Sequence, residues 1–306
     1  MPASRNNLTM QRSGPLAFPL AYAFIFPAIL FLVVFNVYPL LSNVCWSFTN
    51  ADLTGGPWEW VGGRNYARVF SDAKFAAALR TTAWFTALAV TIELTLGFVL
   101  ALALKERFRG KTGLLMLLLV PMMLPPAVMG IYWNFLFDGN YGVINQVLTL
   151  VGMTSPPQWR TNPSLKLIAI LVVDVWMWTP FMLLIALAGL NAIPRHLYEA
   201  AEIDRASTWM VFRRITLPLC APLLVLAALL RSTDALKQFD LVMAITGPND
   251  QATQTLSALL YQVLFGSQRV GLGSAYACVV LVVVIALATA VTRYLDHLAA
   301  RQGKPT

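Results

Sequence analysis

The sequence predicts an all-α membrane protein with about six transmembrane helices, and three observations support this fold class. Of the 306 residues, 58% are hydrophobic and only 12% are charged, whereas roughly 25% of the residues in an ordinary soluble domain are charged. Several apolar runs exceed the about 18 residues that indicate a membrane-spanning helix. The basic residues gather in short segments between these runs. We therefore expect a single membrane domain that covers residues 1–306.

Six apolar segments are the expected transmembrane helices. The first, residues 17–42, follows Arg5 and Arg12 and so has the charge pattern of a secretory signal. It is longer than the apolar core of a signal peptide, which has about 7–15 residues, and it contains three prolines, so we expect it to be retained. The other expected spans are residues 79–104, 113–137, 166–192, 217–237 and 272–295.

The distribution of charge predicts how the chain is oriented. The N-terminus, the turn 105–112, the segment 193–216 and the C-terminal tail together hold 13 of the 22 Lys and Arg residues. The loops between them, residues 43–78, 138–165 and 238–271, are longer and nearly balanced in charge. The positive-inside rule therefore places both termini and the segment 193–216 in the cytoplasm. On this reading the net charge of +8 reflects membrane orientation and does not point to a nucleic-acid partner.

Sequence patterns for nucleotide, metal or nucleophilic chemistry are missing. The stretch "RGKTG" at 109–113 resembles the end of a phosphate-binding loop, but Lys105 stands where that loop needs its first glycine. The three cysteines, at positions 45, 220 and 278, are isolated and match no metal-binding spacing. We therefore expect this chain to bind no metal and no cofactor of its own.

Three carboxylates, Glu93, Asp174 and Asp234, fall inside expected spans. Ionisable groups in a membrane are costly and usually face the interior of the helix bundle or a water-filled path. The pattern is equally compatible with a transport role and with structural pairing.

The fifth expected span brings more charges to a similar depth. Arg231, Asp234 and Lys237 are spaced by three, so neighbouring charges share a helix face. Arg231 lies about 14 residues, or about 21 Å, from the start of this span, which puts it in the outer half of the membrane. The fourth span enters from the outer side, and its Asp174 and its two tryptophans reach a comparable depth.

Tryptophan beside polar groups suits a polyol, because the ring covers apolar C–H faces while the polar groups bind hydroxyls. The alternative is a membrane-belt role for Trp176 and a simple ion pair between Arg231 and Asp234. The predicted substrate path consists of Asp174, Trp176, Trp178, Arg231, Asp234 and Lys237.

The stretch "EAAEIDRASTWMVFRRITLP", residues 199–218, is a charged insert between two apolar segments. Ala200 and Ala201 are small enough to let another surface approach the backbone. Thr216 is a suitable N-cap for the next helix, and Pro218 is tolerated in its first turn. The pattern predicts a short helical hairpin of the kind that docks into a groove.

This insert resembles the cytoplasmic signature of binding-protein-dependent ATP-binding cassette (ABC) importers, E-A-A-x3-G-x9-I-x-L-P. The positions that match in register are Glu199, Ala200, Ala201, Ile215, Leu217 and Pro218. The position of the signature glycine is Arg205, which is a departure. Further stretches resemble the sugar-permease branch of these importers: residues 38–53, 142–148, 174–190, 231–248 and 271–277.

The resemblance implies a type I importer permease fold in a bacterial inner membrane, surrounded by lipid. It implies a second, similar permease, two ATPase subunits that hold ATP and Mg²⁺, and an external binding protein that delivers a sugar or polyol. This chain would then not be an enzyme, and its insert would be the coupling helix that docks on the ATPase. The residues implied in this docking are Glu199, Ala200, Ala201, Asp204, Arg205, Leu217 and Pro218.

Two other functions compete with this interpretation, and one structural expectation accompanies it. A self-contained transporter would use Glu93 or Asp174 for proton or sodium coupling, and it would often show two similar halves, which this sequence lacks. An intramembrane enzyme would use Glu93, Asp174 or Asp234 as acid–base groups.

In the insert, arginine at position 205 disfavours a positive φ, so we expect the turn there to use ordinary backbone angles.

Overall fold

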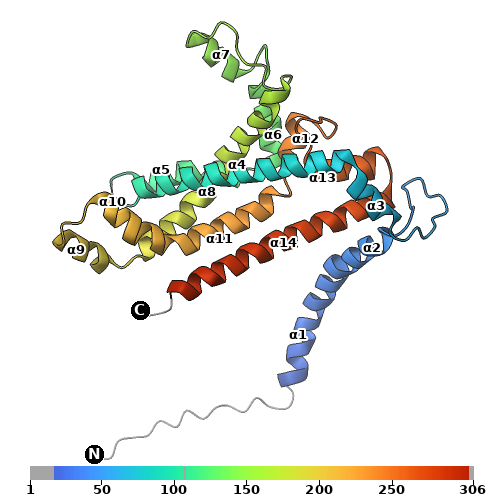
Figure 1. Cartoon of the computed structure of the whole chain (residues 1–306), viewed down its shortest axis with the longest axis horizontal. Helices are drawn as coiled ribbons and strands as arrows, with labels where there is room; N and C mark the ends of the chain where they lie inside the picture. The colour runs from blue at the N-terminus through green and yellow to red at the C-terminus, as the bar shows by residue number, and fades with distance from the viewer. Residues whose placement is uncertain (1–16, 107, 303–306) are drawn as a thin grey trace, which may run out of the picture.

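Long helices packed side by side make up most of the protein (Figure 1). The structure is a computed structural model that describes residues 17–106 and 108–302, and within these ranges it contains helices and no β-strand. Helices α4 (Ala73–Ala103), α8 (Pro163–Ala192), α11 (Leu217–Ala235) and α14 (Val270–Gln302) form the bundle. The all-α fold predicted from the sequence is therefore confirmed.

The N-terminal helix leaves this bundle. Helix α1 (Ala17–Leu32), a π-helical segment η1 (Val33–Val37) and α2 (Tyr38–Trp46) follow one another without a break. Helix α2 packs against α14, while α1 points away from the other helices (Figure 1). All side chains from residue 25 to residue 41 are exposed. An apolar helix with this exposure is compatible with a membrane environment, because lipid can cover it.

The segment that corresponds to the third expected span is interrupted. It consists of α5 (Lys111–Leu119), a short 3₁₀ turn η2 (Pro121–Met123) and α6 (Pro126–Leu136). Prolines at 121, 125 and 126 each remove a backbone donor and disfavour a continuous helix. Five helical stretches in the described residues are long and apolar enough to cross a membrane: Ile25–Trp46, Ala73–Ala103, Pro163–Ala192, Thr208–Ala235 and Val270–Ala290.

The fifth span begins earlier than the sequence predicts. Helix α10 (Thr208–Val211), a π-helical segment η3 (Phe212–Thr216) and α11 form one continuous stretch. Its cap is Ser207, whose Oγ accepts a hydrogen bond from the amide of Met210. The prediction that Thr216 is the N-cap is therefore wrong. Proline at 218 does not start the helix, because the chain passes through the preceding π segment and continues.

Close contact between α4 and α8 fixes the centre of the bundle. At Gly97 an added Cβ would lie 2.8 Å from the amide nitrogen of Leu183, so a larger residue would push the two helices apart. Small residues at helix crossings allow close packing of this kind in membrane proteins. Phe85, Ile170 and Met177 form an apolar cluster on one side of the crossing. Leu183 and Leu190 belong to a second cluster nearer α9.

Shorter helices complete the structure at the two ends of the bundle. At one end, α9 (Arg195–Ile203) and α10 lie beside each other (Figure 1). The remaining elements lie away from this end, and α7 projects from the side of the bundle beyond α6 (Figure 1). They are α3 (Arg64–Ser71), α7 (Val143–Leu150), α12 (Asp240–Ile245), α13 (Leu256–Tyr261) and the π-helical segment η4 (Gln262–Gly266).

Candidate functional site

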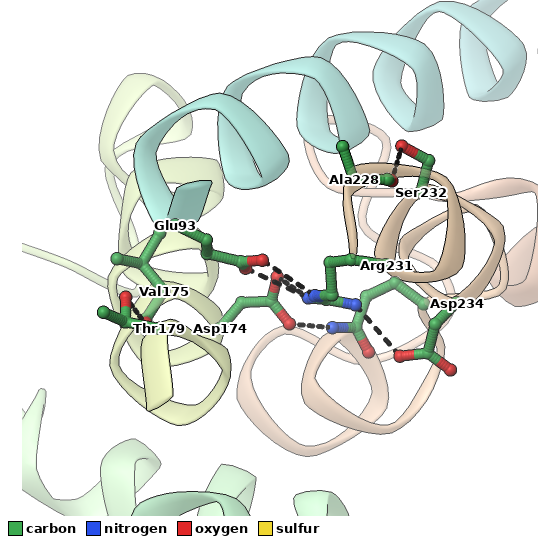
Figure 2. Close-up of polar contacts among 9 residues, drawn as sticks. Glu93, Asp174, Val175, Thr179, Ala228, Arg231, Ser232 and Asp234 are labelled. Carbon is green, nitrogen blue, oxygen red and sulfur yellow. Dashed lines mark hydrogen bonds and ion pairs between the residues drawn. The ribbon is translucent and has the colours of Figure 1, made fainter. Parts of the chain in front are cut away.

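A buried ion cluster joins the three central helices around Arg231 of α11 (Figure 2). The Nε of Arg231 donates to Glu93 Oε2 at 2.9 Å, and its Nη2 lies 3.2 Å from Glu93 Oε1. The same Nη2 also donates to Asp174 Oδ2. On the other side of the guanidinium, Nη1 donates to Asp234 Oδ2 at 2.9 Å. One arginine therefore connects carboxylates from α4, α8 and α11.

Burial makes this cluster energetically important. The side chains of Glu93 and Asp174 are fully buried, and that of Arg231 is 2% exposed. Charges removed from water need partners with good geometry. Arginine provides them here, because its planar guanidinium presents several donors to different carboxylates at once. The arrangement fixes α4, α8 and α11 relative to one another.

Two further side chains complete the surroundings of the guanidinium. The ring of Trp178 faces it, with 4.7 Å between the guanidinium carbon and the ring centroid, which is the distance of a cation–π contact. Gln238 donates to Asp174 Oδ1 at 2.8 Å. Sequence reasoning missed Gln238 as a site residue. It follows the end of α11 at Ala235, in a turn whose path the helical periodicity of the sequence does not predict.

The cluster has one open edge. The side chain of Asp234 is 52% exposed, in contrast to the other two carboxylates. Trp178, whose ring faces the same guanidinium, is half-buried. An exposed carboxylate can accept hydrogen bonds from hydroxyl groups, and an aromatic ring can cover the apolar face of a sugar. This edge therefore has the chemistry of a polyol contact, while the buried part of the cluster holds it in place.

Two residues of the predicted substrate path lie apart from the cluster. Trp176 packs edge-on against Trp133 of α6, with 5.5 Å between the ring centroids. It lines an apolar cavity of about 780 Å³ between α4, α8 and the interrupted α5–η2 segment. Lys237 is exposed, and it forms no ion pair within the described ranges. The structure thus brings together Asp174, Trp178, Arg231 and Asp234, and adds Glu93 and Gln238.

The insert between α8 and α11 forms the predicted short helices. In α9, Glu199 and Ala200 are exposed, while Ala201 is 8% exposed and faces the protein. Asp204 is exposed at the end of α9. Leu217 and Pro218 are exposed at the start of α11. Helix α9 therefore presents one polar face and one small-residue position away from the bundle.

The expectation of ordinary backbone angles at Arg205 is wrong, because Arg205 has φ of 50°. Its amide donates to Glu202 O at 3.0 Å, and the next amide, of Ala206, donates to Ala201 O at 2.9 Å. This pair of bonds is the Schellman motif, which ends a helix with one left-handed residue, usually glycine. The chain keeps the turn that a glycine would favour, although the residue is arginine.

Comparisons with known proteins agree over nearly the whole chain. Residues 93–303 match the family model described as binding-protein-dependent transport system inner membrane component. A trehalose/maltose transport system permease protein of Thermococcus litoralis is 37% identical over 92% of this chain and 94% of its own length. A sulfoquinovosyl glycerol transport system permease protein of Agrobacterium fabrum is 36% identical over 89% of this chain and 88% of its own.

A solved structure shares the fold. The bacterial ABC transporter that imports the acidic polysaccharide alginate superposes with a TM-score of 0.81, over 94% of this chain and 98% of the transporter chain. The sequence identity is 20%, so this likeness concerns the fold alone. The permease fold expected from the sequence is therefore confirmed.

Proposed function

The chain belongs to the family of binding-protein-dependent transport system inner membrane components, and on this premise we propose that it is the permease subunit of an ATP-driven importer for a sugar or polyol. It is a multi-pass inner membrane protein of a transport system. The observation that carries the substrate class is the similarity to whole-length relatives that are named as permeases for trehalose, maltose and a sulfoquinovosyl glycerol.

The ion cluster supports a role in the substrate path. Trp178 and Asp234 form its open edge, where a ring face and a carboxylate would contact C–H and hydroxyl groups of the substrate. Asp174 and Arg231 hold this edge from within the bundle. Of the other two residues predicted for this path, Trp176 lies at the apolar cavity and Lys237 at an exposed position, so neither contacts the substrate at this edge.

Energy for transport comes, in this proposal, from two ATPase subunits that hold ATP and Mg²⁺. Helix α9 docks on one of them through Glu199 and Ala200, with Ala201, Asp204, Arg205, Leu217 and Pro218 shaping the docking segment. A second, similar permease completes the membrane part, and an external binding protein delivers the substrate. Both termini lie in the cytoplasm of a bacterial cell, and this chain itself binds no cofactor.

A self-contained transporter and an intramembrane enzyme explain fewer observations. Neither needs a charged helix with an exposed polar face between α8 and α11. A chain that works alone would also not belong to a binding-protein-dependent family.

Reconstitution in proteoliposomes tests the proposal. Uptake of labelled trehalose, maltose and sulfoquinovosyl glycerol is measured with this permease, its partner permease, the ATPase and the binding protein. We expect uptake of at least one of these compounds only when ATP and the binding protein are present. An ATPase variant that cannot hydrolyse ATP is the control and should abolish uptake. Uptake by the chain alone, driven by a proton or sodium gradient, would refute the proposal.

A further inference from the structure

Tyr198 connects α9 to the turn after α4 and to the π-helical segment η3 that leads into α11. Its hydroxyl lies 3.2 Å from the Oγ1 of Thr216, and either group can be the donor. On the face of its ring, the ammonium group of Lys105 lies 3.7 Å from the ring centroid. Tyr198 is half-buried, and Thr216 is 5% exposed. One side chain of α9 thus makes a cation–π contact with the turn after α4 and a hydrogen bond with η3.

These two contacts lie at the ends of the helices that carry the ion cluster. Lys105 lies two residues after the end of α4, about 18 Å from Glu93 at the rise of a helix, and Thr216 precedes Arg231 on the α10–η3–α11 stretch by about 22 Å. Helix α8, which carries Asp174, leads directly through Ile193 into α9. All three helices of the cluster therefore meet at α9.

The surroundings of α9 limit the other routes by which its movement could reach the bundle. A cavity of about 810 Å³, lined largely by charged side chains, separates part of α9 from the turn that follows α4. Leu197 and Tyr198 are the residues of α9 that join the apolar cluster between α4, α8 and α11. Of these two, only Tyr198 has a polar group that bonds to another helix.

The position of Thr216 adds a second observation. It is the last residue of the π-helical segment η3. Such segments, whose hydrogen bonds span five residues instead of four, interrupt the regular pattern of an α-helix and are frequently found at functional sites. A displacement at Thr216 can therefore change the register of the stretch that leads to Arg231.

We propose that Tyr198 is a positioning residue that transmits movement of α9 to α4 and α11, and through them to the ion cluster around Arg231. This inference rests on the proposed function, in which α9 receives the movement of the ATPase. Lys105 holds the ring, and Thr216 holds the hydroxyl. The two contacts act together, because they hold the ring and the hydroxyl of the same side chain.

The test uses variants of the full complex, each of which lacks one hydroxyl group. Tyr198→Phe removes the hydroxyl and keeps the ring under Lys105, and Thr216→Val removes the other partner while preserving shape. Loss of one neutral hydrogen bond changes an equilibrium by about 2- to 10-fold. We expect each variant to lower the amount of sugar transported per ATP hydrolysed by that factor. The double variant should lose no more than either single one, because both changes remove the same bond.

Two readouts and two controls make the result specific. ATPase that copurifies with the permease should stay at the wild-type level, because the exposed face of α9 is unchanged. Thr216→Ser keeps a hydroxyl and should retain coupling, and Thr208→Val, at an exposed position on α10, should behave as wild type.

Wild-type coupling in Tyr198→Phe and Thr216→Val, additive losses in the double variant, or loss of copurified ATPase would each overturn the inference. If the wild-type complex itself fails to transport sugar with ATP, the proposed function fails instead.

Discussion

Arg231 and Glu93 are 138 residues apart in the sequence, yet their side chains form a two-point contact in the middle of the bundle. The contact connects α11 to α4, and Asp174 extends it to α8 (Figure 2). Because both side chains of the pair are buried, neither can exchange its partner for water. Together with Asp174, this pair therefore fixes α4, α8 and α11 relative to one another.

Removal of Arg231 should destabilise the protein strongly. Arg231→Met leaves two buried carboxylates without their counter-ion, at a cost of about 3–5 kcal/mol. Thermal unfolding in detergent measures the effect. Arg160→Met is the control, since Arg160 pairs with Asp138 at 3.2 Å but its side chain is 40% exposed, and such exposed pairs contribute about 0–1 kcal/mol.

A compensating change sharpens this prediction. Adding Glu93→Gln to Arg231→Met removes one of the unpaired charges and should recover part of the lost stability. Equal unfolding temperatures for Arg231→Met and Arg160→Met would contradict the prediction, and so would a further loss on addition of Glu93→Gln.

Trp178 and Trp176 should behave differently although they are two residues apart. Trp178→Ala removes the ring at the open edge of the cluster, so the KM for uptake should rise by about 10-fold, as expected for loss of one aromatic contact. Trp176→Ala changes the apolar cavity instead and should leave KM within about 2-fold. The measurement is initial uptake in proteoliposomes at a fixed amount of copurified ATPase. The same KM in both variants would remove Trp178 from the substrate path.

The sequence predicts well where the helices lie along the chain, and poorly which side chains of different helices contact one another. Hydropathy locates a span such as Pro163–Ala192, because every residue in lipid must be apolar or paired. It places Asp174 and Arg231 at similar depth, and the structure brings them into contact. It does not indicate that Glu93 of another helix is their partner, because the rotation of a helix is set by packing. Gln238 was missed because it lies in the turn after α11, whose path helical periodicity does not predict.

Two local features were mispredicted, and both depend on context beyond the residue itself. Thr216 has the chemistry of an N-cap, but the helix already begins at Ser207 and continues through a π segment. Arg205 has the chemistry of an ordinary turn residue, but the end of α9 requires a left-handed residue at that place. In each case the hydrogen bonds of the surrounding chain outweigh the preference of one residue.

The proposed orientation predicts which loops react with a membrane-impermeant thiol reagent. A cysteine at Arg109, which is exposed, should be labelled only from the cytoplasmic side, and one at Ser155 only from the outer side. Gly110 is unsuitable because its φ of 86° would strain a cysteine. The native cysteines are first replaced by alanine. Labelling of position 109 from outside intact cells would overturn the proposed orientation.

The last prediction separates docking on the ATPase from the stability of α9. Glu199 is exposed and bonds to no other helix within the described residues. Glu199→Ala should therefore leave the unfolding temperature of the isolated chain unchanged. In the complex, loss of one member of a buried charge pair can cost about 2–5 kcal/mol, and less at a wet rim. We therefore expect less copurified ATPase, or ATP hydrolysis that no longer responds to substrate.

Arg205→Gly should leave ATPase binding unchanged and affect only the stability of the chain. Glycine adopts φ of 50° without the cost of about 1–2 kcal/mol that other residues incur there, and its greater freedom in the unfolded chain offsets about half of that gain. The unfolding temperature of the isolated chain should thus rise slightly or stay level, with ATPase binding close to wild type.

Glu106→Ala, at an exposed position in the turn after α4, is the matched control for the loss of a surface charge in Glu199→Ala. If Glu199→Ala and Glu106→Ala retain equal amounts of ATPase with equal response to substrate, Glu199 does not contact the ATPase.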